Sequence, residues 1–261
     1  MPSIYAHYRF GVNMLPGMPG DVRRTIGRFR RLFDVGLHGP DIFFYNPQLL
    51  KGASDTLGRK YHSQTGRDFF QRACRVTRLE KSEAAQAYLY GVLCHYALDS
   101  LCHPFIREQV ALGPAGHLEI EAEFDRFLLE RDGKRPPESQ DMSPHIQLTP
   151  GECETVAKFY PGATPRSVQS GVANMARLTK LFATPDGARR TVLRKSMETV
   201  SPKFSGLLMT VGPNPRCANL DHTLIQLYDR AIEAFPELLV QIQAQLTYNG
   251  ALGEEFAEQF G

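Results

Sequence analysis

Apolar residues recur at helical spacing along most of the chain. Segment 84–101 is apolar on nearly every side, which is typical of a helix buried in a core. Segments 22–35 and 63–79 carry apolar residues on one side and predict amphipathic helices. No segment alternates convincingly with period two, and no internal repeat is evident. We therefore expect an all-α protein organised around segment 84–101.

Capping residues predict where several later helices begin. Thr149-Pro150 and Thr164-Pro165 are typical helix starts, because threonine caps free N–H groups and proline suits the first turn. Together with further start and stop signals, they favour four helical regions in the second half of the chain. The expected ranges are about 150–160, 165–183, 186–200 and, as a pair broken at Pro236, 219–248.

Glycine and proline predict irregular segments in the first half. Residues 1–20 are rich in both and predict an extended arm, and residues 46–61 predict a loop. Pro104 is expected to break the central helix, because proline removes a backbone hydrogen bond. In segment 36–44 the glycines and a proline predict a tight turn that aims Asp41 inward.

Composition narrows the class of protein. The 261 residues are 42% hydrophobic and 22% charged, as is ordinary for a globular protein, and we expect residues 1–261 to form a single domain. A net charge of +2 indicates no strongly electrostatic partner such as duplex DNA. No run of eighteen apolar residues and no signal-peptide pattern are seen, so a cytoplasmic location is expected. An odd number of cysteines, five, without CxxC spacing favours reduced thiols.

Histidines and carboxylates interrupt the central helix and recur in the next one, expected after a Gly-Pro loop. His95, Asp99 and His103 are four residues apart, as are His117 and Glu121. Residues at this spacing lie one above the other on a helix face. An acid in an apolar helix needs a partner. Imidazole nitrogens and carboxylate oxygens are ligands of zinc, so the pattern predicts a metal site for more than one ion.

Structural roles are expected for the polar and thiol groups nearby. Glu119, Glu123 and Asp125 are interpreted as acids favoured near a helix N-terminus rather than as ligands. Cys94 and Cys102 flank the ligand residues of the central helix, and core packing is preferred over metal binding for both.

Eight residues in order carry a resemblance to a known family. They are His7, Asp41, His62, His95, Asp99, His103, His117 and Glu121. The pattern His…Asp…His…His-x3-Asp-x3-His-x13-His-x3-Glu resembles the zinc-dependent phospholipase C family of bacteria, over about residues 5–125. That family shares its all-α fold with the single-strand-specific nucleases of fungi and plants. The resemblance implies a multi-helix bundle with a zinc-binding cleft, and nothing in the second half of the chain adds to it.

The resemblance also implies how the ligands divide among ions. The first ion would take Asp41, His62, His95 and Asp99, the second His103, His117 and Glu121, and the third His7 and Asp99, which bridges the first and third. The family's third ion also uses a processed N-terminal tryptophan, whereas this sequence has no Trp, so two to three zinc ions are expected. Removal of Met1 would free the Pro2 amine as a substitute. The step from Asp99 to His103 is also shorter than in the secreted phospholipases.

Hydrolysis of a phosphodiester or phosphoester is the chemistry that such a site supports. Closely spaced zinc ions lower the pKa of water towards about 7 and screen phosphoryl oxygens. Asp41 is expected to act as general base or to orient the water, and residual positive charge would favour an anionic substrate. His38 either lines the cleft beside Asp41 or makes a turn-stabilising hydrogen bond.

Two other functions stay open. One is nuclease-like hydrolysis of single-stranded nucleic acid, which would need aromatic platforms beside a basic groove. The other is a zinc-stabilised binding protein without turnover. Structural zinc sites are closed and catalytic ones keep an open position, which separates these cases. The substrate is expected to be a phosphoester, a phospholipid among the candidates, while its head group and the oligomeric state are not predicted.

Overall fold

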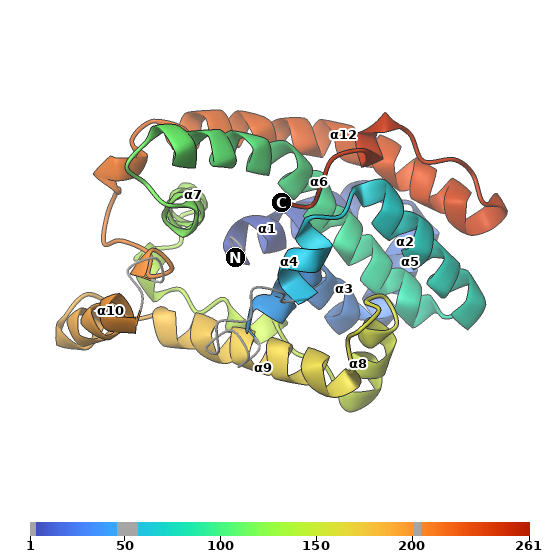
Figure 1. The fold of residues 1–261 in the computed structure, drawn as a ribbon, viewed down its shortest axis with the longest axis horizontal. Coiled ribbons are helices and arrows are strands. Elements are labelled where there is room, and N and C mark those ends of the chain that lie inside the picture. The colour runs from blue at the N-terminus through green and yellow to red at the C-terminus, as the bar shows by residue number, and fades with distance from the viewer. Residues whose placement is uncertain (1–3, 46–56, 201–204) are drawn as a thin grey trace.

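The computed structural model describes residues 4–45, 57–200 and 205–261 (Figure 1). The regular elements in these ranges are helices, and the β-type pairing found there is an isolated bridge between Thr65 and Gln259. The all-α prediction is therefore confirmed. Within the same ranges, no helix is long and apolar enough to cross a membrane.

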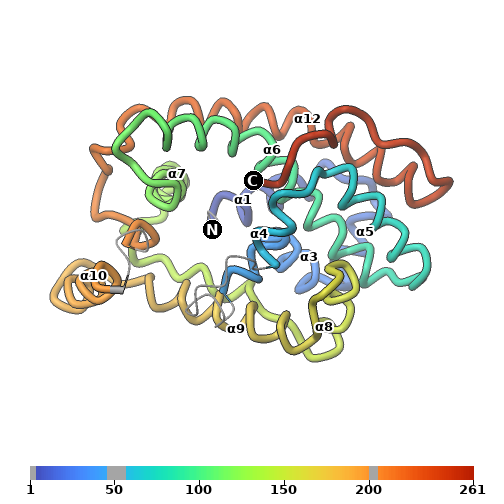
Figure 2. The backbone as a smooth tube through the Cα atoms, in the orientation of Figure 1, coloured from blue at the N-terminus to red at the C-terminus, as the bar shows by residue number. Residues whose placement is uncertain are grey.

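The helices surround a central one, α6 (Glu83–Leu112), as Figures 1 and 2 show. Helix α12 runs along one side of the molecule and α9 along the opposite side, with α10 at one end. Buried hydrophobic side chains from Tyr5 to Phe260 form one core cluster, while the single-domain organisation stays a prediction. The other elements that bear on the site are α1 (Ile4–Met14), α2 (Gly20–Arg28), α3 (Arg30–Gly36), the 3₁₀ helix η2 (Gly39–Tyr45), α4 (Leu57–His62), α5 (Gly66–Glu80), α7 (His117–Arg131), α8 (Pro150–Ala157), α9 (Pro165–Phe182), α10 (Ala188–Val200) and α12 (Leu220–Tyr248).

Helix α6 begins at a capping serine and is buried through its middle. The Ser82 hydroxyl accepts a hydrogen bond from the Ala85 N–H. Every residue from 87 to 100 is buried, as the apolar character on all sides of this segment predicts. Polar groups placed in this stretch are therefore removed from water and depend on partners from neighbouring elements.

Two glycines allow α3 to lie directly against α6. A Cβ on Gly91 would lie 2.3 Å from the Phe33 carbonyl oxygen, and a Cβ on Gly36 would lie 2.6 Å from the Tyr88 carbonyl oxygen. Larger residues would push the two backbones apart. Because α3 leads directly into η2, this close approach brings Asp41 to the side of α6.

The N-terminal segment is a helix, so the prediction of an extended arm over residues 1–20 is wrong for the described part. Helix α1 covers Ile4–Met14 and buries Tyr5, Ala6 and Phe10. Most of the glycines and prolines that suggested an arm lie after residue 14. The backbone N–H groups of Tyr5 and Ala6 donate to Asp125, a residue of α7, so a tertiary contact stabilises this helix start.

Two predicted helix breaks are also wrong. Helix α6 continues through Pro104 to Leu112, and α12 is continuous through Pro236. Both prolines are exposed, and each helix continues although it lacks one backbone N–H donor at that position. Residues 57–62 form α4 instead of the expected loop, and the rest of that loop, residues 46–56, lies outside the described residues.

The remaining helix predictions are close to the structure. The expected helix over 22–35 is interrupted at Phe29 and divides into α2 and α3. The Thr149 hydroxyl accepts from the Glu152 N–H, and the Thr164 hydroxyl accepts from the Ser167 N–H, so both threonine caps are confirmed.

Candidate metal centre

Five elements bring the eight predicted ligands together beside α6. Helix α6 carries three of them on successive turns of one face, and α7 carries two more in its first five residues. The others come from α1, from the turn η2 and from the last residue of α4. The residues are His7, Asp41, His62, His95, Asp99, His103, His117 and Glu121.

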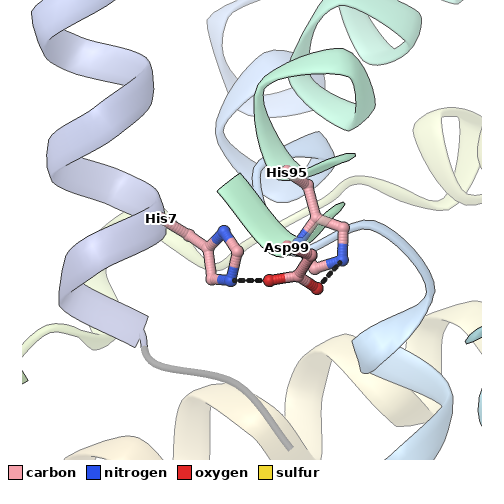
Figure 3. Close-up of side chains that lie close together, drawn as sticks. All are labelled: His7, His95 and Asp99. Atoms are coloured by element: carbon pink, nitrogen blue, oxygen red, sulfur yellow. Dashed lines mark ion pairs between the residues drawn. The ribbon is translucent and has the colours of Figure 1, made fainter. Parts of the chain in front are cut away.

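Asp99 lies among three imidazoles, and Figure 3 shows two of them, His7 and His95. Its Oδ1 is 3.1 Å from His7 Nε2, and its Oδ2 is 3.0 Å from His95 Nε2. The same Oδ1 lies 3.6 Å from His103 Nε2. The three imidazoles are therefore the partners that Asp99, an acid in a buried helix, requires, and through them Asp99 connects α1 with two turns of α6.

The other two carboxylates each lie between two imidazoles. Asp41 Oδ1 is 2.7 Å from His62 Nε2, and Asp41 Oδ2 is 3.8 Å from His95 Nδ1. On the opposite side of Asp99, Glu121 Oε1 lies 3.4 Å from His103 Nε2 and 3.2 Å from His117 Nε2. Imidazoles and carboxylates thus alternate without interruption from His62 to His117.

Three groups within this array bring three possible ligand atoms within 4.8 Å of one another. Two of the groups share His95, and together the three contain all eight predicted residues. They are His7–His95–Asp99, Asp41–His62–His95 and His103–His117–Glu121. Cys94 and Cys102 are buried and belong to none of the three, in agreement with core packing.

Burial and the alternating charges keep the acids ionised. Burial opposes ionisation of Asp99, but the imidazoles of His103, His95 and His7 hold the pKa of this carboxyl well below its usual range. Burial likewise opposes the ionisation of Glu121, and His117 lowers the pKa of that carboxyl below its ordinary value. The pKa of Asp41 is also lowered, mainly by His95 and His62 against the effect of burial.

The donor set fits a metal ion. Asp41 Oδ2 and His7 Nδ1 are buried and have no hydrogen-bond partner among the described residues. A buried polar atom without a partner is costly, and a bound cation would satisfy a carboxylate oxygen directly. Imidazole and carboxylate are the ligands that zinc takes in mixed sites.

Backbone carbonyls orient two of the histidines. His62 Nδ1 lies 2.8 Å from the Gly58 carbonyl oxygen, and His95 Nδ1 lies 3.2 Å from the Leu37 carbonyl oxygen. An N–H donated to a carbonyl fixes the tautomer and leaves the other ring nitrogen for a metal. Gly39 has a φ of +46°, and a Cβ there would lie 2.7 Å from the His95 ring, so this turn needs glycine.

The C-terminal segment closes one side of the array, a feature that sequence reasoning missed. The Phe260 ring stacks on His95 with centroids 6.0 Å apart, and the Gly261 N–H donates to the His62 carbonyl oxygen. A Cβ on Gly261 would lie 2.4 Å from His103 Nδ1. Phe-Gly is no recognisable motif, so no signal in the sequence pointed to these residues.

The acids of α7 have different roles from those expected. Glu119 lies in the first turn, as predicted. Glu123 is buried and pairs with Arg126 at 2.7 Å, and Asp125 is buried and accepts backbone hydrogen bonds from α1. The prediction of helix-end acids is wrong for these two because packing against other elements decides their role.

His38 pairs with another histidine. Its Nε2 lies 2.8 Å from His145 Nε2, and the His145 ring stacks on Tyr8. Burial lowers the pKa of His38 well below its ordinary value, with a further lowering from the neighbouring His145. One of the two interpretations is that His38 makes a hydrogen bond within its own turn. A hydrogen bond is present, but its partner His145 lies in a distant 3₁₀ helix, Ser143–His145.

The array opens to a cavity at His117. The side chain of His117 is 33% exposed, whereas the other four histidines of the array are at most 11% exposed. His117 lines a cavity of about 700 Å³, which Arg194 and Arg216 also line. A smaller cavity of about 90 Å³ reaches Glu121. Leu118, Ala122 and Met209 line both cavities, so the two adjoin along α7.

Comparison with known proteins agrees with this geometry. The model of the family described as zinc dependent phospholipase C matches residues 6–158, which is more than half of the chain. The chain therefore belongs to the zinc-dependent phospholipase C family. All eight predicted ligands fall within the matched range. No curated protein and no solved structure shows significant similarity to the chain.

Proposed function

We propose that this chain is a zinc-dependent phosphoric ester hydrolase that acts on phosphodiesters through a multinuclear zinc site. The observation that carries the proposal is the uninterrupted, buried array of five imidazoles and three carboxylates that opens to a cavity at one end. Membership of a zinc-dependent family supports the identity of the metal. The proposed ligands are the eight residues of the array.

The division of ligands among ions follows the three clusters. The cluster Asp41, His62 and His95 is proposed for one ion, with Asp99 added as the bridging ligand that the family resemblance implies. His103, His117 and Glu121 are proposed for a second ion. His7 and Asp99 are proposed for a third, with His95 beside them. The suggested ligand role of the Pro2 amine concerns residues outside the described ranges. Two to three zinc ions are proposed on these grounds.

Asp41 is proposed as the general base or water-orienting group. His62 engages its Oδ1 at 2.7 Å, which leaves Oδ2 without a hydrogen bond among the described residues. The lowered pKa keeps the carboxylate ionised and able to accept a proton at Oδ2. Zinc ions, when bound, acidify water and screen the negative phosphoryl oxygens. The protein orients the proposed ligands and buries all of them except His117, which is 33% exposed.

The cavity at His117 supports a substrate with a large substituent. A volume of about 700 Å³ exceeds the space that a phosphoryl group needs and falls in the range of ordinary ligand sites. Its walls combine apolar residues such as Val110 and Leu208 with charged residues of both signs, namely Arg194, Arg216, Glu119, Glu123 and Glu198. A phosphodiester with a bulky, partly apolar substituent fits this lining, and phospholipids are one class with that chemistry.

The lining of this cavity disfavours the two alternatives. Single-strand nucleases need aromatic platforms for bases, and the described residues lining the 700 Å³ cavity include no Phe or Tyr, while the sequence has no Trp. Tyr5, Tyr45 and Phe182 line the adjoining cavity, which has a volume of only about 90 Å³. A purely structural zinc site is closed, whereas the exposed face of His117 gives this array access to a cavity.

Metal analysis combined with a panel of phosphodiester substrates tests the proposal. Purified wild-type protein is expected to hold two to three zinc ions and to hydrolyse at least one substrate. Asp41→Asn is expected to lower turnover by about 10²- to 10⁴-fold, the usual contribution of a general base. Full turnover in this variant would remove Asp41 from its role, and wild-type protein without zinc would overturn the whole assignment.

A further inference from the structure

We infer that Asp125 is a positioning residue, which holds His7 in the metal centre by capping the helix that carries it. This inference rests on the proposed zinc site. Asp125 does not belong to any of the three ligand clusters, and it lies one turn beyond Glu121 on α7. His117, Glu121 and Asp125 are four residues apart, so they follow one face of this helix.

Asp125 binds the start of α1 with both carboxylate oxygens. Its Oδ2 accepts from the Tyr5 N–H at 2.9 Å, and its Oδ1 accepts from the Ala6 N–H at 2.8 Å. The first N–H groups of a helix lack intrahelical partners, and a negative charge there is favourable. The first turn of α1 contains no acid of its own. Asp125, which is 7% exposed, supplies both the acceptors and the charge.

His7 follows these two residues directly and has little else to orient it. Its Nε2 reaches Asp99 Oδ1, but its Nδ1 is buried without a hydrogen-bond partner among the described residues. His62 and His95, in contrast, are each oriented by a backbone carbonyl. The His7 ring packs against His95, with centroids 4.5 Å apart. Its distance from Asp99 therefore depends on where α1 begins, which Asp125 determines.

A second acid, Asp132, directly follows α7 as its C-cap residue and provides a matched control. Asp132 Oδ2 accepts from the Tyr5 hydroxyl at 2.6 Å, and its oxygens also accept from the Arg9 guanidinium. Its side chain is 26% exposed, and its contacts are to side chains rather than to the backbone beside His7. Asp132 thus attaches the same helix to α7 without fixing the first turn.

The consequence is that α7 serves two parts of the centre. It supplies His117 and Glu121 as ligands, and through Asp125 it places a third ligand that belongs to another helix. Loss of an outer partner commonly lowers metal affinity by about 10- to 100-fold. For Asp125 we expect that loss to affect only the ion that His7 contacts.

The test compares Asp125→Asn with Asp132→Asn, each in the wild-type and in the His7→Ala background. Bound zinc per chain is measured by mass spectrometry after equilibration with chelators of graded affinity, and circular dichroism reports folding. Asparagine places an amide N–H where an acceptor is needed. Asp125→Asn is expected to lower the affinity for one zinc ion by about 10- to 100-fold and to leave the affinity for the others unchanged. In the His7→Ala background the same change is expected to have no further effect on zinc affinity. Asp132→Asn is expected to retain all ions.

Two results would overturn the inference. One is wild-type zinc affinity in Asp125→Asn. The other is an equal loss of zinc when the same change is made in His7→Ala, which would mean a general structural role. If Asp125→Asn does not fold, Asp125→Glu is measured in the same way, because it keeps the charge and moves the carboxylate by one methylene. Wild-type protein without zinc would instead refute the proposed function itself.

Discussion

The Asp99 carboxylate of α6 lies 3.1 Å from the His7 imidazole of α1. This contact joins two elements that are far apart in the sequence, and it lies beside His95 and His103, which face the same carboxylate. Three imidazoles therefore approach the carboxylate of Asp99.

Replacement of Asp99 is expected to remove more zinc than replacement of any residue at the edge of the array. Asp99→Asn keeps the shape of the side chain but loses the charge, so two proposed ions lose a ligand. His7→Ala affects one. Bound zinc per chain should therefore be lower in Asp99→Asn than in His7→Ala when both are equilibrated with the same chelator. Equal zinc contents would contradict the bridging role of Asp99.

Removal of zinc is expected to lower the melting temperature. A ligand that binds only the folded state at 100 times its dissociation constant stabilises that state by about 2.7 kcal/mol per site. Thermal unfolding is measured with and without EDTA. The shift should be large for wild-type protein and small for Asp99→Asn, which serves as the control. No shift in the wild type would mean that zinc does not contribute to folding stability.

Substitution of Gly261 is expected to weaken zinc binding. A Cβ at this position would lie 2.4 Å from His103 Nδ1 and 2.9 Å from His62 Cδ2, so Gly261→Ala displaces two proposed ligands. Overpacking of this kind costs about 1–3 kcal/mol. Gly151→Ala is the control, because nothing lies within 4 Å of a Cβ there. Isothermal titration with zinc compares the two variants. Equal affinities would show that the C-terminal segment can shift to accept the methyl group without displacing the proposed ligands.

Asp221 is expected to make stability depend on pH. Burial, with a smaller contribution from Glu123, raises the pKa of Asp221 to about 7, and Asp221 Oδ1 has no hydrogen-bond partner among the described residues. The folded state binds this proton more tightly than the unfolded state. The resulting contribution to the free energy of unfolding is therefore fully present below the unfolded pKa of about 4. It is lost as the pH rises through 7.

Asp221→Asn should therefore be more stable than the wild type at pH 8 and close to it at pH 4. The side chain is only half-buried, so the expected gain is about 1 kcal/mol. Asp229→Asn changes an exposed acid on the same helix and should show no such trend. The comparison of melting temperatures at several pH values is the measurement. If melting temperature depended on pH in the same way in both variants, Asp221 would be excluded as the cause of the pH dependence.

The sequence was sufficient for those parts of the fold and site that depend on local spacing. The threonine caps at 149 and 164 act within three residues, and the predicted bonds are present. The steps of four along α6 and α7 likewise place His95, Asp99, His103, His117 and Glu121 on inward faces. Helical periodicity fixes such relationships without knowledge of the neighbours.

Features that depend on contacts between residues far apart in the sequence could not be predicted from the sequence. Helix α1 is capped by Asp125, which is 119 residues from Ala6, so nothing near its start indicated a helix. Pro104 and Pro236 are tolerated because they face solvent, and exposure is a property of the packed fold. Phe260 and Gly261 meet the array only because the last segment pairs with the residues around Thr65.

The helical backbone fixes the spacing of the three proposed ligands on α6. One turn of an α-helix rises about 5.4 Å, and the interval between His95, Asp99 and His103 is set by backbone hydrogen bonds rather than by the ions. The buried middle of α6, with α3 packed closely on it, gives this backbone little freedom to stretch. A larger cation such as cadmium would then have to be accommodated by rotation of the side chains, because the spacing of these three residues along the helix would not change.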